Sequence, residues 1–521
     1  MEGPRDATEC ACRPDPLDSG TLRPFGGNAR TGLAHCHELD STTRVTSKEE
    51  RPEPQNADPR RLLPSVDRLL VLANDLGLIE AYGRERVLVH ARAMLDEWRR
   101  RDDLTEAGVE GVGAELAGRL AELDRQRVRR VINATGIFLH TNLGRAPLSP
   151  AVASRIPELS TAAVDVEFDL ETGQRGDRNR RINALLQEIT DCESALATNN
   201  NAAALVLALG ALVAEDLERR PDAEGRGEVI VSRGELVEIG GSFRIPDILR
   251  LAGVRLVEVG TTNRTRIEDV RAAVTDRTLG VLKVYSSNYR IVGFTESVSP
   301  EQLAAFGQET GIPVLVDEGS GLLAPSDHEP LRDHPSIREL LAVGCDLVCG
   351  SADKVLGGPQ AGLLLGRQQW IERCRRHPLY RALRPGRLVV AALSEVLDRH
   401  LRARGIPLDG LFVDAEAHRQ RLEKVRATWA GMGGVPPLDI VAADAFVGGG
   451  SAPERPVPGE ALALSVSTEV QRCLRLGDPA VVARMVDGAL LLDLRSVAPP
   501  DDAVLLDALR AALAVVAGEA G

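Results

Sequence analysis

The feature that most limits how this chain can fold is the alternation of short apolar runs and helix-like segments between residues 129 and 385. The runs end at turn residues and read SALAT (194–198), EVIVS (228–232), VRLVEV (254–259), VLKVY (281–285), PVLVD (313–317) and CDLVCG (345–350). Segments such as SPEQLAAFGQETG lie between them and have the spacing of helices. Continuously apolar strands joined by helices indicate an α/β fold with a mostly parallel sheet covered on both faces. Ligands of such sheets bind at the carboxyl ends of the strands.

Three further parts are predicted around this region. Residues 61–128 carry apolar residues three and four positions apart and predict a helical N-terminal domain. Residues 386–521 start with a helical stretch and then contain the strand-like segments ALALSVS and ALLLDLRSV, which predict a small α+β domain. Residues 1–60 are rich in Pro, Gly, Asp, Arg and Thr, show little periodicity and predict a disordered extension. The central part, 129–385, is then the large domain.

The charge distribution separates the helical part from the rest of the chain. The formal net charge of −13 argues against a general nucleic-acid coat protein, which would carry broad positive charge. Residues 61–130 are balanced instead, with 13 arginines and 13 carboxylates, and their arginines cluster in WRRRDD and RQRVRR. These clusters are either solvated helix ends or contacts to a phosphate backbone.

Several classes of protein are excluded by what the sequence lacks. No apolar run reaches the length of about 18 residues that a membrane span needs, and the N-terminus has no apolar secretory segment. Eight cysteines are too sparse for a disulfide scaffold in a chain of 521 residues. We therefore expect a cytoplasmic enzyme. No metal site is expected, because the cysteines and histidines near the N-terminus fit no standard zinc spacing; they are Cys10, Cys12, His35, Cys36 and His37.

Lysine is rare in this chain, which narrows the search for a reactive amine. The sequence has four lysines, Lys48, Lys283, Lys354 and Lys424. Lys354 follows the apolar strand CDLVCG and precedes a glycine pair, so it belongs at the ligand-binding edge of the sheet. Lys283 lies within VLKVY and could also be buried. A Schiff-base lysine must be desolvated and rigidly held, and Lys354 fits this best, although it could be an ordinary turn lysine.

Two more features complete the requirements of a pyridoxal-phosphate (PLP) site. The cofactor needs a carboxylate that keeps its pyridine nitrogen protonated, and Asp317 ends the strand PVLVD at the same edge. It also needs a phosphate cradle, and ATNNNAAA (197–204) places Asn200 and its neighbours at the start of a helix. Asp317 could equally cap a helix, and Asn is common at helix starts in any protein. The three features together favour PLP.

Longer strings of the sequence resemble bacterial selenocysteine synthases, the L-seryl-tRNA(Sec) selenium transferases. They are INATGIFLHTNLGRAPLS, EFDLETGQRG, ATNNNAAA, VIVSRGELVEIGGSFRIPD, LVEVGTTNRT, SNYRIVGFTE, DEGSG, SADKVLGGPQAG and RALR. The resemblance runs from LPSVDRLL at residue 63 to the C-terminal DLRSV. One departure is Ala352, where this family usually has glycine before the Asp–Lys pair.

The resemblance implies both a fold and a set of site residues. The fold is that of the aspartate-aminotransferase-like PLP enzymes, fold type I. Lys354 is then the PLP lysine and Asp317 the partner of the pyridine nitrogen. The phosphate would be held by Asn200, Asn201, Ala202 and Ala203. The phosphate end of selenophosphate would be bound by Arg145, Arg381 and Arg384, since a guanidinium matches phosphate geometry. Asp353, beside the lysine, is a candidate acid or a group that tunes the lysine.

The reaction implied by the resemblance converts seryl-tRNA(Sec) to selenocysteyl-tRNA(Sec). It would use selenophosphate and pass through a PLP-bound aminoacrylyl intermediate, with the N-terminal helices holding the tRNA and the chains assembled as a ring of dimers. One alternative is a PLP-dependent lyase or ammonia-lyase acting on a small amino acid or amino sugar phosphate. Another is an inactive protein that binds tRNA or a protein partner.

Overall fold

The computed structural model describes residues 63–100, 111–221, 227–239, 243–286, 289, 291–402, 412–451 and 455–519. The contacts divide the chain into two compact units, residues 1–127 and 128–521. The extension predicted for residues 1–60, with its cysteines and histidines, lies outside the described residues. No helix in the described ranges is long and apolar enough to cross a membrane.

The first unit is helical. Its described helices are α1 (Val66–Asp75), α2 (Leu78–Tyr82), α3 (Arg84–Trp98) and α5 (Val112–Arg125). Ser65 begins α1 because its side chain accepts a hydrogen bond from the Arg68 amide, which would otherwise lack a partner. The helices enclose an apolar core that includes Leu69, Met94 and Leu116. The indole N–H of Trp98 lies 3.2 Å from the carboxylate of Glu115 and joins α3 to α5.

The second unit is built around a seven-stranded sheet with the order β2-β10-β9-β8-β7-β3-β6. Its strands are β2 (Ser194–Thr198), β3 (Glu228–Ser232), β6 (Arg255–Val259), β7 (Thr278–Val284), β8 (Val314–Asp317), β9 (Leu347–Ser351) and β10 (Gly362–Gly366). All neighbouring pairs are parallel except the two that involve β10. The six apolar runs of the sequence are the six strands other than β10.

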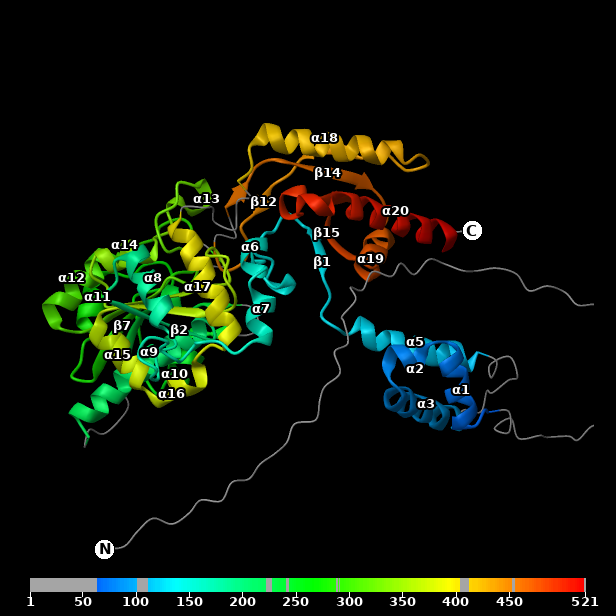
Figure 1. Ribbon diagram of the computed structural model, residues 1–521. Helices are drawn as coiled ribbons and strands as arrows, with labels where there is room; N and C mark the ends of the chain where they lie inside the picture. The colour runs from blue at the N-terminus through cyan, green and yellow to red at the C-terminus, as the bar shows by residue number, and fades with distance from the viewer. Residues whose placement is uncertain are drawn as a thin grey trace, which may run out of the picture. The chain divides into compact units, whose positions relative to one another are not determined.

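Helices cover both faces of this sheet, as Figure 1 shows. One apolar core lies under α9 (Asn201–Arg219), α10 (Ile245–Leu251) and α15 (Gln368–Arg376). The other lies under α8 (Arg180–Thr190), α12 (Pro300–Thr310), α14 (Ile337–Ala342) and α17 (Arg387–Leu401). Since both faces are covered, the central strands can be apolar at every position, which explains the continuous runs.

A five-stranded sheet of order β1-β15-β16-β14-β11 forms the C-terminal part of the same unit. Its strands are β1 (Val131–Ala134), β11 (Asp439–Ala442), β14 (Glu460–Ser465), β15 (Ala480–Val486) and β16 (Ala489–Leu492). Three helices share its core: α18 (Ala415–Gly431), α19 (Thr468–Leu476) and α20 (Asp502–Glu519) (Figure 1). This is the α+β arrangement predicted for the end of the chain.

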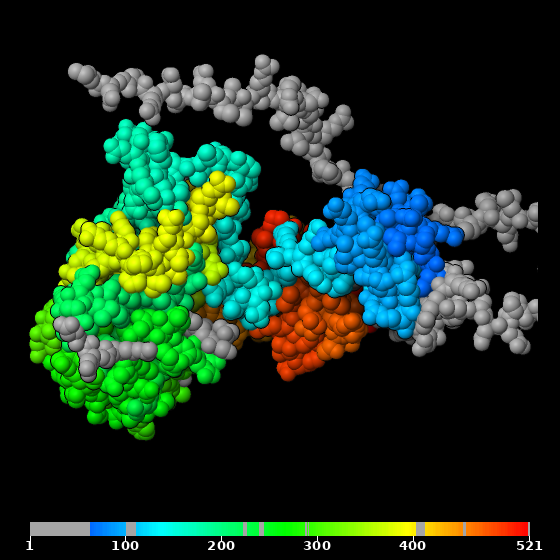
Figure 2. Space-filling model, turned by 90° about the horizontal axis from the view of Figure 1, so that it is seen from below, coloured from blue at the N-terminus to red at the C-terminus, as the bar shows by residue number. Residues whose placement is uncertain are grey.

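Two elements, one strand and one helix, pack in a different domain from the one in which the sequence analysis placed them. Strand β1 was expected in the large domain of residues 129–385, but it pairs in parallel with β15 and buries Ile132 in the C-terminal core. Helix α17 was expected at the start of the small domain, but it packs on α8 and contributes Leu393 and Leu397 to the large-domain core. Figure 2 shows the yellow surface around α17 against the teal surface of the chain near α8. The helical pattern of α17 was recognised in the sequence, whereas β1 was not singled out as a strand, and the pattern could not assign the tertiary partners of either element.

The remaining elements are short. The helices and 3₁₀ turns are η2 (Thr141–Leu143), α6 (Pro150–Ala153), α7 (Ile156–Thr161), η3 (Arg233–Glu235), α11 (Ile267–Ala272), α13 (Glu329–Arg332), α16 (Pro378–Leu383), η4 (Leu494–Ser496) and η5 (Pro499–Asp501). Two small antiparallel pairs join β4 (Glu238–Ile239) to β5 (Phe243–Arg244) and β12 (Ala445–Phe446) to β13 (Pro456–Val457).

Replacing Ile132 with Ala should destabilise the C-terminal core by about 2–5 kcal/mol, as deletion of a buried isoleucine side chain does. The three tryptophans allow this to be measured locally, because Trp429 shares a core with Ile132 while Trp98 and Trp370 lie in other cores. In a protein that keeps only Trp429, the denaturant midpoint of fluorescence should fall. Val128→Ala, at a fully exposed position, is the control. A lower midpoint in a protein that keeps only Trp370, without a change in the protein that keeps only Trp429, would contradict the placement of β1.

Candidate active site

Lys354 lies in the turn after β9, at the carboxyl edge of the large sheet, and is 7% exposed. Its Nζ donates hydrogen bonds to the backbone carbonyls of Gly319 at 3.0 Å and Gly450 at 3.1 Å. Gly450 has a φ of +89°, and a Cβ there would lie 2.5 Å from Nζ, so this close approach requires glycine. The amine is therefore held between the turn after β8 and a glycine turn of the C-terminal part.

The surroundings of Lys354 favour an uncharged amine. Burial lowers the pKa of Lys354; the nearby Asp317 opposes this shift and the guanidinium of Arg145 adds to it. Lys283, the competing candidate, is also buried but differs in its partner. Its Nζ lies 2.9 Å from the Glu235 carboxylate, so this side chain is engaged in an ion pair. Of the two buried lysines, Lys354 has the environment that a nucleophilic amine needs.

Asp317 ends β8 and is buried beside Lys354. Burial raises the pKa of Asp317, and hydrogen bonds from Asn201 and the Cys349 thiol partly offset this. The Asn201 amide donates to Oδ1 at 2.8 Å, and Cys349 stands opposite Asp317 in the register of β8 and β9. A buried carboxylate held by two neutral donors is well suited to a cationic ring nitrogen, which would stabilise its charged form.

The start of α9 forms the predicted cradle. Asn200 is the N-cap, and its side-chain oxygen accepts a hydrogen bond from the Ala203 amide at 2.9 Å. Ala202 lies in the first turn, where amide groups and the helix dipole favour an anion. Gly362 on β10 lets the strand pass the cradle, because a Cβ there would overlap the Asn200 carbonyl oxygen. The side-chain oxygen of Asn201 is buried without a hydrogen-bond partner in the described part of the chain, which fits a site that receives a ligand.

Arg145 and Asp353 form an ion pair next to Lys354. The Arg145 Nη1 lies 2.7 Å from Asp353 Oδ2, and the Ser351 hydroxyl donates to Asp353 Oδ1 at 3.0 Å. Arg145 has a φ of 61°, unusual for a residue with a side chain, so the loop after η2 is shaped to present it. The pair places one positive and one negative charge at the side of the lysine.

The other two predicted arginines lie elsewhere in this chain. Arg384 Nη1 lies 3.1 Å from the Glu167 carboxylate, which Arg178 also contacts. Both arginines line a separate cavity of about 400 Å³. Arg381 is exposed on α16. The three arginines that the resemblance groups together therefore do not meet around one point within one chain.

Sequence reasoning missed the groups that hold Lys354. The backbone carbonyls of Gly319 and Gly450 carry no signature of their own, but the run VGGGS (447–451) is a visible signal of close backbone approach. Cys349 was interpreted as a packing residue, although it also contacts Asp317.

The fold and the site define an aspartate-aminotransferase-like, fold-type-I protein, the class that uses PLP. In agreement, the chain is similar in fold to a solved structure described as "Structure of D-Glucosaminate-6-phosphate Ammonia-lyase", with a TM-score of 0.54, 23% identity, and coverage of 75% of this chain and 97% of that one.

Sequence comparison identifies the family. The family described as "L-seryl-tRNA selenium transferase" matches residues 131–498, and "Selenocysteine synthase N terminal" matches residues 60–99. L-seryl-tRNA(Sec) selenium transferase of Geobacter sulfurreducens is 40% identical over 86% of this chain and 98% of its own length. The protein of the same name from Moorella thermoacetica is 40% identical over 88% of this chain and 98% of its own length. The chain belongs to the L-seryl-tRNA selenium transferase family.

Replacing Arg145 with Gln should raise the pKa of Lys354, because it removes a positive charge that disfavours the ammonium and leaves the Asp353 carboxylate unpaired. The test is competitive acylation of the cofactor-free protein across a pH series, with the modified lysine quantified by mass spectrometry. Half-modification of Lys354 should move to higher pH in Arg145→Gln and stay in place in Arg181→Gln, which removes a distant surface arginine. An unchanged or lower midpoint in Arg145→Gln would contradict the inference that Arg145 lowers the pKa of Lys354.

Proposed function

We propose that this protein converts seryl-tRNA(Sec) to selenocysteyl-tRNA(Sec) with selenophosphate, using PLP carried by Lys354. The observation that supports this most strongly is the buried Lys354 amine, beside a buried Asp317; among the described residues this amine contacts two backbone carbonyls and no carboxylate. The relatives that share the family, and that this chain matches over nearly their whole length, are named for that activity.

The residues present fit the cofactor at each of its ends. Lys354 would hold the aldehyde carbon, Asp317 would face the ring nitrogen, and the phosphate would lie on the first turn of α9 at Asn200–Ala203. The unpartnered amide oxygen of Asn201, next to Asp317, offers an acceptor for a donor brought in by a ligand. When bound, PLP withdraws electrons from the α-carbon of an attached amino acid and makes its proton acidic.

Lys354 is the group we assign to proton transfer at that carbon. The lowered pKa of Lys354 favours the uncharged amine, which is the form that can take the α-proton. Asp353 opposes this shift through its negative charge, and its pairing with Arg145 limits the effect. In our proposal Asp353 therefore tunes the lysine and orients Arg145 rather than donating a proton.

Selenophosphate is assigned to Arg145, Arg381 and Arg384, because guanidinium groups bind phosphate oxygens in pairs. Since one chain does not bring these arginines together, the proposal includes a homo-oligomer in which neighbouring copies complete the site. Substrate tRNA is assigned to the helical unit, where part of the family match lies. Arginine pairs on its surface, such as Arg99 with Asp96, are exposed and can exchange a carboxylate for a phosphate at low cost.

Lys354→Ala should abolish the visible absorption of the bound cofactor, because no other lysine among the described residues lies in the site to hold its aldehyde carbon. Lys424→Ala, at an exposed position in α18, should retain it. Absorbance spectra of purified protein incubated with PLP would give the answer. Loss of the band in Lys283→Ala, together with its persistence in Lys354→Ala, would move the assignment to Lys283.

The full chain should form selenocysteyl-tRNA(Sec) from seryl-tRNA(Sec) and selenophosphate and should use free serine on the order of a hundredfold less efficiently, because free serine lacks the remote binding energy of the tRNA. Product analysis and kcat/KM for both substrates test this. Removal of residues 1–127 should reduce the preference for the charged tRNA. Equal use of free serine would instead support a lyase of small amino acids.

A further inference from the structure

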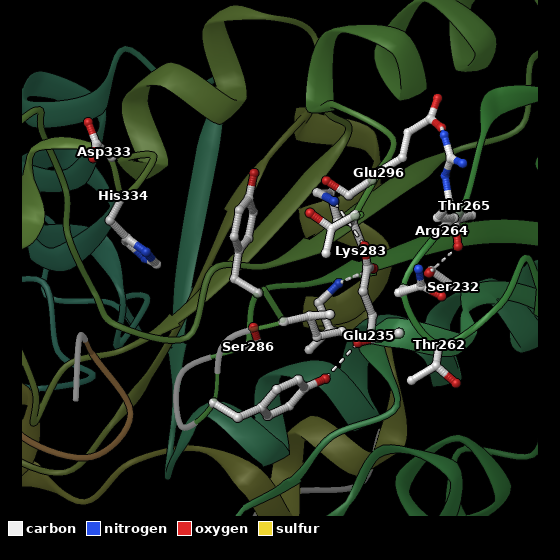
Figure 3. Close-up of a pocket in the computed structure, with 18 of the residues that line it drawn as sticks. Ser232, Glu235, Thr262, Arg264, Thr265, Lys283, Ser286, Glu296, Asp333 and His334 are labelled. Carbon is white, nitrogen blue, oxygen red and sulfur yellow. Dashed lines mark hydrogen bonds and ion pairs between the residues drawn. The ribbon is translucent and has the colours of Figure 1, made fainter. Parts of the chain in front are cut away.

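A second cavity lies beside the site, at the carboxyl ends of β3, β6 and β7. Its volume is about 470 Å³, within the range of roughly 300–1,000 Å³ that is typical of small-molecule sites. Hydroxyl-bearing side chains dominate its wall, among them Thr262, Thr265, Ser286, Tyr285, Tyr289 and Ser451. Figure 3 shows Lys283 and Glu235 near the middle of this wall, Arg264 and Glu296 toward one end, and His334 and Asp333 toward the other.

The cavity reaches the catalytic candidates at two points. The Gly450 carbonyl accepts a hydrogen bond from Lys354, and the next residue, Ser451, lines the cavity. The Tyr285 amide donates to the Asp317 carbonyl at 3.0 Å, and the Tyr285 side chain lines the same cavity. Through Ser451 and Tyr285, the wall of the cavity is therefore directly connected to the residues that contact Lys354 and Asp317.

One polar group in the wall lacks a protein partner. Ser451 is 3% exposed, and its hydroxyl is buried without a hydrogen bond to the described residues. A buried hydroxyl without a partner costs stability unless a ligand or water satisfies it. Ser451 directly follows Gly450, whose carbonyl accepts the hydrogen bond from Lys354.

The charges in the wall argue against a small anion as the ligand. Each of the three lining cations lies close to a carboxylate: Lys283 with Glu235 at 2.9 Å, Arg264 with Glu296 at 2.9 Å and Arg455 with Asp333 at 3.0 Å. Cations neutralised in this way give little attraction for a dianion such as selenophosphate or phosphate. The cavity is also much larger than such an ion needs.

The uncharged groups suit a nucleoside. Serine and threonine hydroxyls both donate and accept, as the hydroxyls of a ribose and the edges of a base require. Tyrosine rings provide the flat faces on which unpaired bases stack. The Tyr289 hydroxyl donates to the Gly234 carbonyl at 2.6 Å, which anchors that ring in the wall.

We propose that this cavity binds the 3′-terminal nucleoside of the aminoacyl-tRNA. The inference rests on the proposed function, because that nucleoside carries the seryl ester on its ribose. The ester joins the ribose to the carboxyl carbon, so the ribose must lie next to the place where the α-carbon meets Lys354. The wall at Ser451 meets this requirement, because the preceding residue, Gly450, contacts the Lys354 amine.

AMP, the 3′-terminal nucleotide of a mature tRNA, is the probe. Calorimetry with the PLP-loaded full chain should show saturable binding of AMP that inorganic phosphate does not displace. Ser451→Ala, which removes one unpartnered hydroxyl and little volume, should weaken AMP binding about three- to tenfold, the loss expected for one hydrogen bond. Tyr289→Leu, which removes a stacking face, should weaken it further. Ser154→Ala, on the exposed end of α6, is the matched control and should bind AMP as the unaltered protein does.

Absence of AMP binding, binding unaffected by both variants, or equal displacement by phosphate would overturn the proposal. The test is independent of turnover. If the protein converts seryl-tRNA(Sec) but the variants leave AMP binding unchanged, the cavity assignment fails and the proposed function stands. If AMP binds and the variants weaken it but no seryl-tRNA(Sec) is converted, the proposed function fails.

Discussion

The burial of one amine organises the second unit of this protein. Lys354 projects from the large sheet, yet its nitrogen is held by carbonyls from two other places, the turn after β8 and the glycine turn of the C-terminal part. At Gly450 the backbone approaches the amine closer than a side chain would allow. The low-dielectric surroundings that lower the pKa of the amine thus require both sheets to be in place at once, and reactivity at Lys354 is a property of the folded unit as a whole.

The parts of this site that depend on local pattern could be predicted from the sequence. Lys354, Asp317 and Asn200 each stand at the end of an apolar run, and parallel strands bring such ends to one edge. Asn201, at the start of α9, reaches Asp317 at the end of β8 although β2, the strand before α9, lies three strands away in the sheet, a relation between elements that no local pattern contains. Likewise, no local pattern showed that residues 131–134 form a strand whose partner is β15.

Arginine pairing was the least predictable feature. Most arginines of the described chain lie within reach of a carboxylate, so an arginine in a family motif can be part of a structural pair and of a binding site at once. Arg384 with Glu167 and Arg145 with Asp353 are both of this kind. In the cavity near β7 the cations are likewise paired with carboxylates. The hydroxyls and aromatic rings of its wall therefore determine which ligand can bind.

The pairing of β1 with β15 also bears on how the protein is made. The ribosome synthesises β1 several hundred residues before its partner, β15. The first strand of the small sheet therefore lacks this partner while the whole large sheet emerges and can fold. The glycine turn at 448–450 that closes over Lys354 is also among the later segments to emerge. During synthesis, the amine therefore stays open to solvent, and to an incoming aldehyde, until the last part of the chain has arrived.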